Sequence, residues 1–426
     1  MSVTRISGAT LLAGEIDLET ATDGQVLGGT DEGTGWSVAV VEGDLLIGQP
    51  AARAVVRVAA PVDDAELVVP QNKWSVDTPG FGHQVLTMAT DAGFDLWVSS
   101  PDHDEARGGV WRFRDAHAAD VAGGEPDLLV TPSSPADRLG THLHHCGDLT
   151  GDGVDDLAVW IPWFQPPDDW SVADPGLVPA VAGAVAVLES EQLATATGEV
   201  RPWDVGPIYW GASTGASAGA GVHCTDDLDD DGLDDLLIGA PHADNQAGQV
   251  YVVTQPLPAS GLVTEVAWGT ITSPLSGSWF GEALHAFEWS GATTLVIGAP
   301  GAREGRGSAY LYVGAGLDAD PSPLAAYDNP RTTPDHLGRS LATADLDGDG
   351  EVELILGAPD YREDSRTYGV GRLWVFRADQ ELGAPIAEAA GTLTDTQPFR
   401  RVGQQIVPAD LDGDGTDELL LPVQLP

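Results

Sequence analysis

The sequence predicts an all-β fold, a seven-bladed β-propeller with four-stranded blades. A recognisable unit of sequence recurs seven times along the 426 residues. Each unit has room for about four short strands, which is the content of one propeller blade. Glycine (53 residues) and proline (30 residues) are abundant, and apolar runs are short. This composition favours many strands joined by turns.

Each unit begins with a marker glycine, continues with a hairpin and an apolar run, and ends with a β-rich strand. The apolar run often closes on Gly-Ala-Pro. The marker glycines are Gly35, Gly82, Gly140, Gly219, Gly281, Gly338 and Gly403. They predict one propeller domain over residues 1–426, with blades starting near 33, 80, 138, 217, 279, 336 and 401. Third strands are expected at 55–58, 110–113, 184–187, 250–253, 309–312 and 373–376.

The seventh unit stops after its second strand, and the N-terminal residues offer the missing strands. Residues 3–8 and 15–18 are β-rich, like the third and fourth strands of the other units. We therefore expect residues 2–30 to complete the last blade. A ring closed in this way leaves only short, protected strand edges.

Four units carry an acidic loop, which is clearest at residues 345–353. Carboxylates stand at relative positions 1, 3, 5 and 9, a glycine at position 6 lets the chain turn, and the backbone carbonyl of position 7 can face the same centre. The predicted metal ligands are Asp148, Thr150, Asp152, Val154, Asp156; Asp227, Asp229, Asp231, Leu233, Asp235; Asp345, Asp347, Asp349, Glu351, Glu353; and Asp410, Asp412, Asp414, Thr416, Glu418.

Hard oxygen ligands in a flexible cage suit calcium, so the sequence predicts about four calcium ions with a structural role. An isolated acidic loop could be a solvated turn, but four copies in one register favour metal binding. An EF-hand is excluded, because an apolar run and a proline follow each loop and position 12 holds no glutamate.

The formal net charge of −47 argues against binding of nucleic acid or of an anionic membrane through a general field. No stretch is long and apolar enough for a membrane helix, so we expect no direct membrane insertion. Residues 1–5 do not begin a signal peptide. Either such a segment has been removed or the chain is not exported, and the calcium loops favour removal and an extracellular or cell-surface location. The sequence does not indicate the oligomeric state.

Aromatic residues gather in an insertion within the third unit and in the connection that follows it. Both segments should lie on the face opposite the acidic hairpins, where exposed aromatic side chains mark interaction surfaces. The candidate ligand-binding residues are Trp163, Phe164, Trp170, Tyr209 and Trp210. The alternative is that these side chains pack the insertion onto the propeller.

His144, His223 and His285 each follow a marker glycine by four residues in consecutive units. They could hold a transition metal in the central channel, although packing between blades or lining of a wet channel is favoured. Cys146 and Cys224 belong to adjacent units, but their registers differ by one residue. Because such a difference tends to point side chains to opposite faces, two buried free thiols are favoured over a disulfide.

The combination of Phe-Gly or Leu-Gly, the acidic loop and Gly-Ala-Pro resembles the FG-GAP repeat. That repeat builds the seven-bladed β-propeller at the head of integrin α subunits and of related bacterial surface proteins. The resemblance covers nearly the whole chain and implies calcium at the four loops, on one face of the disc. Units one, two and five depart from the loop pattern, so no metal is assigned to them. Thr150 replaces a carboxylate and makes its loop the weakest of the four sites.

The leading functional hypothesis is a calcium-stabilised binding module that recognises a protein or a glycan through the face opposite the hairpins. One alternative is a secreted carbohydrate-active enzyme, a lyase or glycosidase, with its site in the channel. The other is a scaffold domain with no ligand of its own. No nucleophile elbow, phosphate loop or zinc-protease motif supports an enzyme, and propellers host many unrelated functions.

Overall fold

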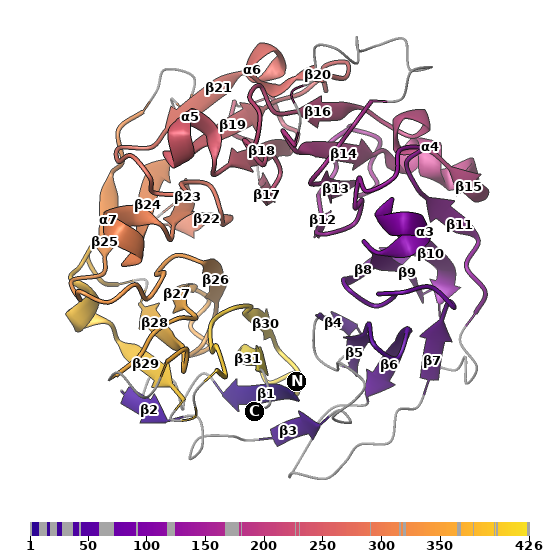
Figure 1. The fold of residues 1–426 in the computed structure, drawn as a ribbon. Helices are drawn as coiled ribbons and strands as arrows, with labels where there is room; N and C mark the ends of the chain where they lie inside the picture. The colour runs from indigo at the N-terminus through magenta and orange to yellow at the C-terminus, as the bar shows by residue number, and fades with distance from the viewer. Residues whose placement is uncertain are drawn as a thin grey trace.

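A computed structural model of the chain describes residues 2–7, 15–17, 24–27, 37–41, 44–58, 72–90, 93–116, 124–166, 179, 181–225, 227–229, 231–289, 291–314, 317, 321–363, 368–377, 379–395, 397 and 399–423. Small β-sheets stand side by side in a ring (Figure 1). The predicted all-β propeller is confirmed. Gly35 and Trp170 lie outside the described residues.

The described strands form seven sheets. In chain order, the first three comprise β4 (Val38–Val41), β5 (Asp44–Gln49), β6 (Ala54–Val58), β7 (Asn72–Ser75); β8 (Val85–Thr90), β9 (Gly93–Ser100), β10 (Gly109–Ala116), β11 (Leu128–Val130), β15 (Gly198–Val200); and β12 (Leu143–His145), β13 (Leu157–Ile161), β14 (Ala184–Leu188), β16 (Ile208–Trp210), β20 (Gly261–Leu262).

The remaining four comprise β17 (Gly221–Thr225), β18 (Asp235–Ala240), β19 (Gln249–Val253), β21 (Gly269–Thr272); β22 (Leu284–Trp289), β23 (Ala292–Ala299), β24 (Ser308–Val313), β25 (Ala325–Asp328); β26 (Ser340–Ala344), β27 (Glu353–Ala358), β28 (Arg372–Phe376), β29 (Gly391–Thr394), β2 (Glu15–Asp17); and β30 (Val407–Ala409), β31 (Glu418–Val423), β1 (Ser2–Ser7), β3 (Gly24–Leu27). The first strand of each sheet faces the middle of the ring (Figure 1). The predicted third strands are confirmed as β6, β10, β14, β19, β24 and β28.

The described helices are single turns or little more, at the rims of the sheets. They are α3 (His103–Ala106), α4 (Ser190–Thr195), α5 (Ala243–Gln246), α6 (Val263–Val266), α7 (Ala302–Gly305), η1 (Pro202–Asp204) and η3 (Ile386–Glu388). None of these helices in the described part of the chain has the length and apolar character needed to cross a membrane.

The N-terminal strands close the ring, with one difference from the expectation. β1 pairs antiparallel with β31, and β3 pairs with β1, so these two strands complete the last sheet. β2 was also expected in that sheet, and this was wrong. It pairs in parallel with β29, at the outer edge of the preceding sheet. β15 and β20 cover outer edges of other sheets in the same parallel manner.

Glycine permits the close approach of neighbouring sheets. A Cβ on Gly239, at the end of β18, would lie 2.0 Å from the carbonyl oxygen of Gly281 in the next unit. Gly298 stands in the same relation to Gly338, also at 2.0 Å. The apolar residue before each described marker glycine, such as Phe280, is fully buried between the sheets. The repeated glycines therefore set the spacing of the ring.

Candidate functional site

The four acidic loops fold alike, each between the first and second strand of its sheet. In the loop between β26 and β27, Asp345 holds the turn. Its Oδ1 accepts the N–H of Gly348 at 2.7 Å, and its Oδ2 accepts the N–H of Gly350 at 3.0 Å. Gly350 has φ +87°, a conformation that glycine adopts without strain. The equivalent glycines are Gly153, Gly232 and Gly415, with φ of +85°, +90° and +88°.

In three loops, carboxylate oxygens from positions 1, 3 and 9 converge to within 4.8 Å of one another. These three groups are Asp227, Asp229, Asp235; Asp345, Asp347, Glu353; and Asp410, Asp412, Glu418. The local spacing alone predicted all nine of these residues. The carboxylate at position 5 has a different contact, because Asp231, Asp349 and Asp414 each accept the N–H of the residue two positions later.

Several loop oxygens are buried without a hydrogen-bond donor in the described structure. They are Asp229 Oδ1, Asp235 Oδ1 and Asp347 Oδ1. An orphaned buried oxygen is costly, and the two in the second loop, on Asp229 and Asp235, face one centre where a positive partner would stabilise them. The residues therefore fit a divalent cation, and hard carboxylate oxygens are the donors that calcium prefers.

Burial raises the pKa of three position 9 carboxyls, those of Asp156, Asp235 and Glu353, and neighbouring carboxylates add to the shift. The pKa of Asp235 rises to about 7, and that of Glu353 rises to about 7. A divalent ion among these oxygens would favour their ionised forms and reverse the shift. The acidic groups are thus held together more closely than their charges alone would favour.

The loop at Asp148 differs from the other three, as the threonine at position 3 suggested. It forms no group of three converging carboxylates among the described residues. Two of its carboxylates instead contact Ser190, which begins α4. Ser190 Oγ donates to Asp152 Oδ2 at 2.7 Å, and Ser190 N–H donates to Asp156 Oδ1 at 2.7 Å. No local sequence pattern indicated this contact.

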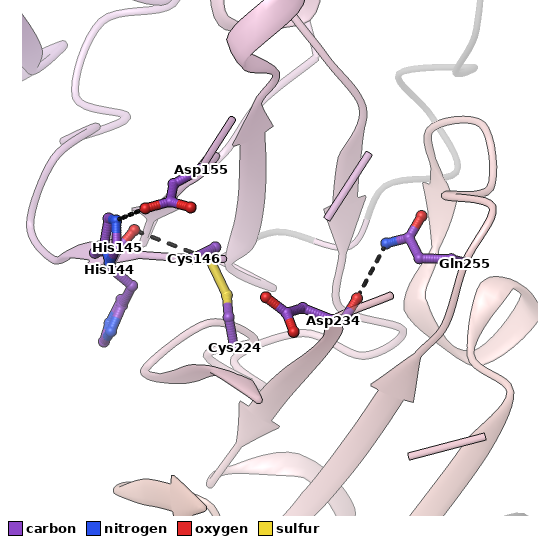
Figure 2. Close-up of a disulfide and its surroundings, with 7 residues drawn as sticks. All are labelled: His144, His145, Cys146, Asp155, Cys224, Asp234 and Gln255. Carbon is purple, nitrogen blue, oxygen red and sulfur yellow. Dashed lines mark hydrogen bonds and ion pairs between the residues drawn. A yellow bond between two sulfur atoms is a disulfide. The ribbon is translucent and has the colours of Figure 1, made fainter. Parts of the chain in front are cut away.

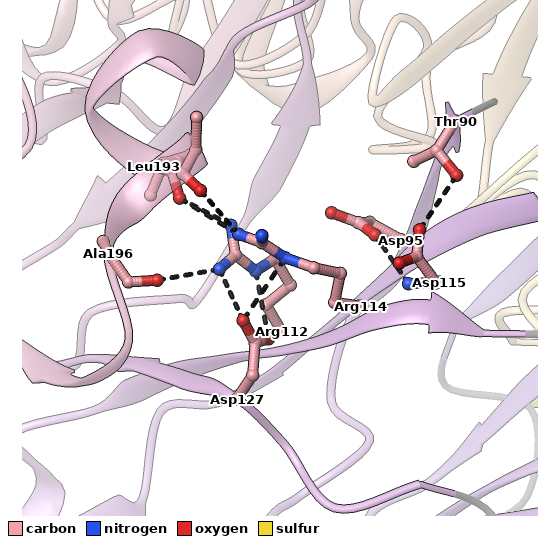
Figure 3. A network of polar contacts seen from close by, with 9 residues as sticks. Thr90, Asp95, Arg112, Arg114, Asp115, Asp127, Leu193 and Ala196 are labelled. Atoms are coloured by element: carbon pink, nitrogen blue, oxygen red, sulfur yellow. Dashed lines mark hydrogen bonds and ion pairs between the residues drawn. The ribbon is translucent and has the colours of Figure 1, made fainter. Parts of the chain in front are cut away.

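Helix α4, which carries Ser190, is held from the neighbouring sheet by Arg112 of β10 (Figure 3). The Arg112 guanidinium donates to the carbonyl oxygens of Leu193 at 2.8 Å and Ala196 at 2.9 Å, at the C-terminal end of the helix. It also forms a two-pronged ion pair with Asp127, with distances of 3.1 and 2.6 Å. Cations are favourable at helix C-termini, so this network fixes both the helix and the loop beside it.

Neighbouring loops contact one another. Asp417 lies at position 8 of the last loop, and its N–H donates to the carbonyl oxygen of Asp345 at 2.7 Å. The Asp345 N–H in turn donates to Asp417 Oδ2 at 2.9 Å. Asp234 holds the same position in its loop and lies against Gly147 of the preceding unit. Position 8 therefore joins each of these hairpins to the one before it.

A disulfide joins Cys146 and Cys224 (Figure 2), so the expectation of two free thiols was wrong. The Cα atoms are 5.0 Å apart. The register argument failed because β12 ends at His145, one residue before Cys146, and side-chain alternation no longer applies there. The bridge ties the first and second acidic hairpins together, close to Asp148 and Asp227.

The three predicted channel histidines do not form a converging group in the described structure. The rings of His223 and His285 lie 5.1 Å apart. His223 Nε2 accepts the N–H of Ala286 at 3.0 Å, and His285 Nε2 contacts Thr343 Oγ1 at 2.9 Å. Burial lowers the pKa of His144 to about 3. These contacts favour neutral, packed histidines, and a metal at His144, His223 and His285 stays a prediction.

Most of the predicted aromatic ligand residues are buried. Phe164, Tyr209 and Trp210 have exposed fractions of 1%, 0% and 6%, so their prediction as surface contacts is corrected. Phe164 packs on Trp210, and the Tyr209 hydroxyl donates to the Pro258 carbonyl oxygen at 2.8 Å. Tyr209 and Trp210 belong to β16, which is buried along its length, and Phe164 lies in the same hydrophobic cluster as Trp210. Trp163 is 44% exposed, with the Arg138 guanidinium 5.7 Å from its ring.

Sequence reasoning missed a row of residues two positions before the marker glycines. Arg138, Ser217, Trp279, His336 and Arg401 all have positive φ, between 54° and 58°. Non-glycine residues rarely adopt this conformation, and it often marks functional positions. These positions stand at the same distance from their marker glycines, but they hold different residue types, so they form no sequence motif.

These features define a class of protein: a β-propeller with acidic loops between the first and second strands of its sheets. A family model for the FG-GAP repeat matches residues 224–253 and 337–376. Those residues contain the whole of the second and the third acidic loops. These two segments are FG-GAP repeats, in agreement with the resemblance seen in the sequence.

Similarity to curated proteins supports this assignment. Human integrin alpha-X is 31% identical over 226 residues, covering 50% of this chain and 19% of the relative. Human integrin alpha-IIb is 40% identical over 91 residues, covering 20% and 8%. Rat phosphatidylinositol-glycan-specific phospholipase D is 31% identical over 152 residues, covering 32% and 18%. The chain spans less than a fifth of the length of each of these relatives.

Proposed function

We propose that the chain is a calcium-stabilised binding module of the cell surface or extracellular space. Calcium would bind at the four acidic loops, most weakly at the loop that contains Thr150. The convergence of carboxylates at one end of three sheets is the observation that supports this proposal. The disulfide is consistent with an oxidising compartment.

Each of the seven sheets is proposed to be one blade of a single propeller domain, closed by β1 and β3. The sheet order supports this division, since every sheet contains an uninterrupted antiparallel set of four strands. Stiff hairpins on one face leave the opposite face for recognition of a protein or a glycan. We expect no nucleic-acid binding, because the net charge of −47 is unfavourable.

The ligand role can be tested with Trp163, the one exposed aromatic residue among the described candidates. Glycan arrays and pull-downs would compare the wild-type chain with Trp163→Ala, in calcium and in chelator. We expect a bound ligand in calcium, at least tenfold weaker binding by Trp163→Ala, and weaker binding in chelator. Trp268→Ala provides the matched control, because Trp268 is also exposed, at 37%. Binding that is unaltered by Trp163→Ala would exclude Trp163 from the interface, and the absence of any bound ligand would contradict the binding module.

A further inference from the structure

Three residues from three successive sheets meet on the face opposite the acidic hairpins. Trp279, His336 and Arg401 occupy the same register, two positions before a marker glycine, and have φ of 55°, 56° and 54°. In β26 and β27, Ala344 pairs with Glu353 beside the acidic loop, whereas Ser340 pairs with Gly357 at the other end. His336 lies at this other end, so the sheet separates it from the cation loop.

These side chains line a pocket of about 220 Å³, together with Arg339, Asp360 and Gln404. The ring of His336 stacks on that of Trp279, with centroids 5.8 Å apart and planes inclined by 12°. Ligand sites for drug-sized molecules usually begin near 300 Å³, so this pocket has the size for a single ring. Its stacked wall offers that ring a flat surface.

Asp360 organises the polar side of the pocket. It is 8% exposed, its Oδ2 pairs with His336 Nδ1 at 2.7 Å, and its Oδ1 accepts a hydrogen bond from Arg401 Nη2 at 2.8 Å. Burial raises the pKa of Asp360, but the bond with His336 and the charge of Arg401 outweigh it and lower the pKa overall. The ionised carboxylate therefore fixes His336 and Arg401 before any ligand arrives.

Two arginines give the pocket donors for an anion. Arg339 Nη1 contacts Glu282 Oε1 at 2.5 Å, and its side chain is 44% exposed. Arg401 is 37% exposed and contacts Asp360 through Nη2. A guanidinium has five N–H donors in a planar fork, so each arginine retains donors beyond its contact with a carboxylate. Because the whole chain has only 19 lysines and arginines, two arginines in one pocket are unusual for its surface.

We propose that this pocket binds a carboxylated sugar residue, a hexuronate, within an acidic glycan. Arg339 and Arg401 would receive the carboxylate, whose planar shape matches the guanidinium fork. The sugar ring would lie against the wall that Trp279 and His336 form. This inference rests on the proposed function, because it assigns a ligand to the face opposite the hairpins. The pocket is a different site from that of Trp163, because residues at the ends of the last three sheets form it.

Calorimetric titration with trigalacturonate would test the pocket, with the carboxyl-reduced trisaccharide as the neutral comparison. We expect at least tenfold tighter binding of the acidic trisaccharide. Arg401→Gln and Trp279→Ala should each weaken its binding at least tenfold. Arg303→Gln should leave it unchanged, since Arg303 is an exposed arginine that also pairs with a carboxylate, Asp328, outside the pocket. A thermal melt of each variant would verify folding.

Two results would overturn the proposal: equal affinity of wild type for the acidic and neutral trisaccharides, or unchanged trigalacturonate affinity in a folded Arg401→Gln variant. A wild type that binds no trigalacturonate but captures another ligand in a Trp163-dependent manner would also overturn the pocket, while the proposed function would stand. Failure to bind trigalacturonate or any array and pull-down ligand would contradict both.

Discussion

Gly239 lies where the sheet of β17–β19 and β21 comes closest to its neighbour. The oxygen of Gly281 leaves no room for a side chain there, since an added Cβ would be 2.0 Å away. This contact explains at the level of one atom why glycine recurs before Ala-Pro. A repeat motif that looks like a turn signal in sequence is therefore also a packing requirement between sheets.

The Gly239→Ala variant should be destabilised by about 2 kcal/mol or more, because overpacking forces the two backbones apart. Gly124→Ala is the matched control, since no atom of the described residues lies within 4 Å of a Cβ at Gly124. That control should change the free energy of unfolding by less than about 0.5 kcal/mol. Urea denaturation of both variants measures the difference, and equal stabilities would contradict the packing argument.

Each acidic hairpin brings together carboxylates that repel one another. The first aspartate and the position 6 glycine define the turn without any ion, as the hydrogen bonds of Asp345 show. The repulsion among positions 1, 3 and 9 remains, and a bound cation would cancel it. Metal binding and hairpin stability should therefore be linked.

Removal of calcium with a chelator should lower the melting temperature by several degrees. An ion that binds only the folded chain at one hundred times its Kd stabilises by about 2.7 kcal/mol. Asp229→Asn should reduce this calcium-dependent shift, because Asp229 Oδ1 is an orphaned oxygen. Asp77→Asn is the control, since the Asp77 side chain is 93% exposed. A melting curve that is identical in calcium and chelator would contradict the structural role.

The disulfide is a second link between hairpins, and its loss should be measurable. Cys146→Ser combined with Cys224→Ser should lower the free energy of unfolding by about 2–4 kcal/mol, since the bridge restricts the unfolded chain. The wild type should melt earlier in reductant, whereas the double variant should be insensitive to it. Alkylation of the denatured wild type without reductant gives an independent check, because free thiols would be labelled and the bridge would not.

Local sequence patterns predicted the strands well, whereas the predictions that failed depend on contacts between distant segments. The converging carboxylates of three acidic loops could be predicted because each set lies within nine residues of sequence. The position of β2 was missed because parallel pairing with β29 depends on how the ring closes. The burial of Tyr209 depends on neighbouring sheets and could not be read from its own segment. The Trp279 pocket combines three sheets, so no local spacing indicated it.

At the scale of the molecule, partly buried histidines make the middle of the ring sensitive to acid. Burial lowers the pKa of His142 to about 4, of His144 to about 3, of His223 to about 3 and of His285 to about 4. Each is below the ordinary value of about 6.5 in the unfolded chain. As the pH falls below 6.5, these histidines therefore take up protons first in the unfolded chain. The free energy of unfolding decreases until the pH reaches the pKa values of the folded protein.

Replacement of two of these histidines should weaken the acid sensitivity. Between pH 6.5 and 5.5, the double variant His144→Gln and His223→Gln should lose about 2 kcal/mol less stability than the wild type, at about 1 kcal/mol per histidine. Raised carboxyl pKa values, such as about 8 for Asp137, act in the opposite direction but equally in both proteins. Denaturation at a series of pH values measures the difference, and parallel pH profiles would contradict neutral buried histidines.

The pairing of β1 with β31 has a consequence for how this disc can be connected to other proteins. Ser2 lies opposite Val423, so the segments by which the chain enters and leaves the ring lie side by side. A unit with adjoining ends can be inserted into a loop of a host chain without separating the host's own segments. The same adjacency permits circular permutation: a short linker between the two ends, with new ends opened in a hairpin that carries no cation loop, should preserve the ring.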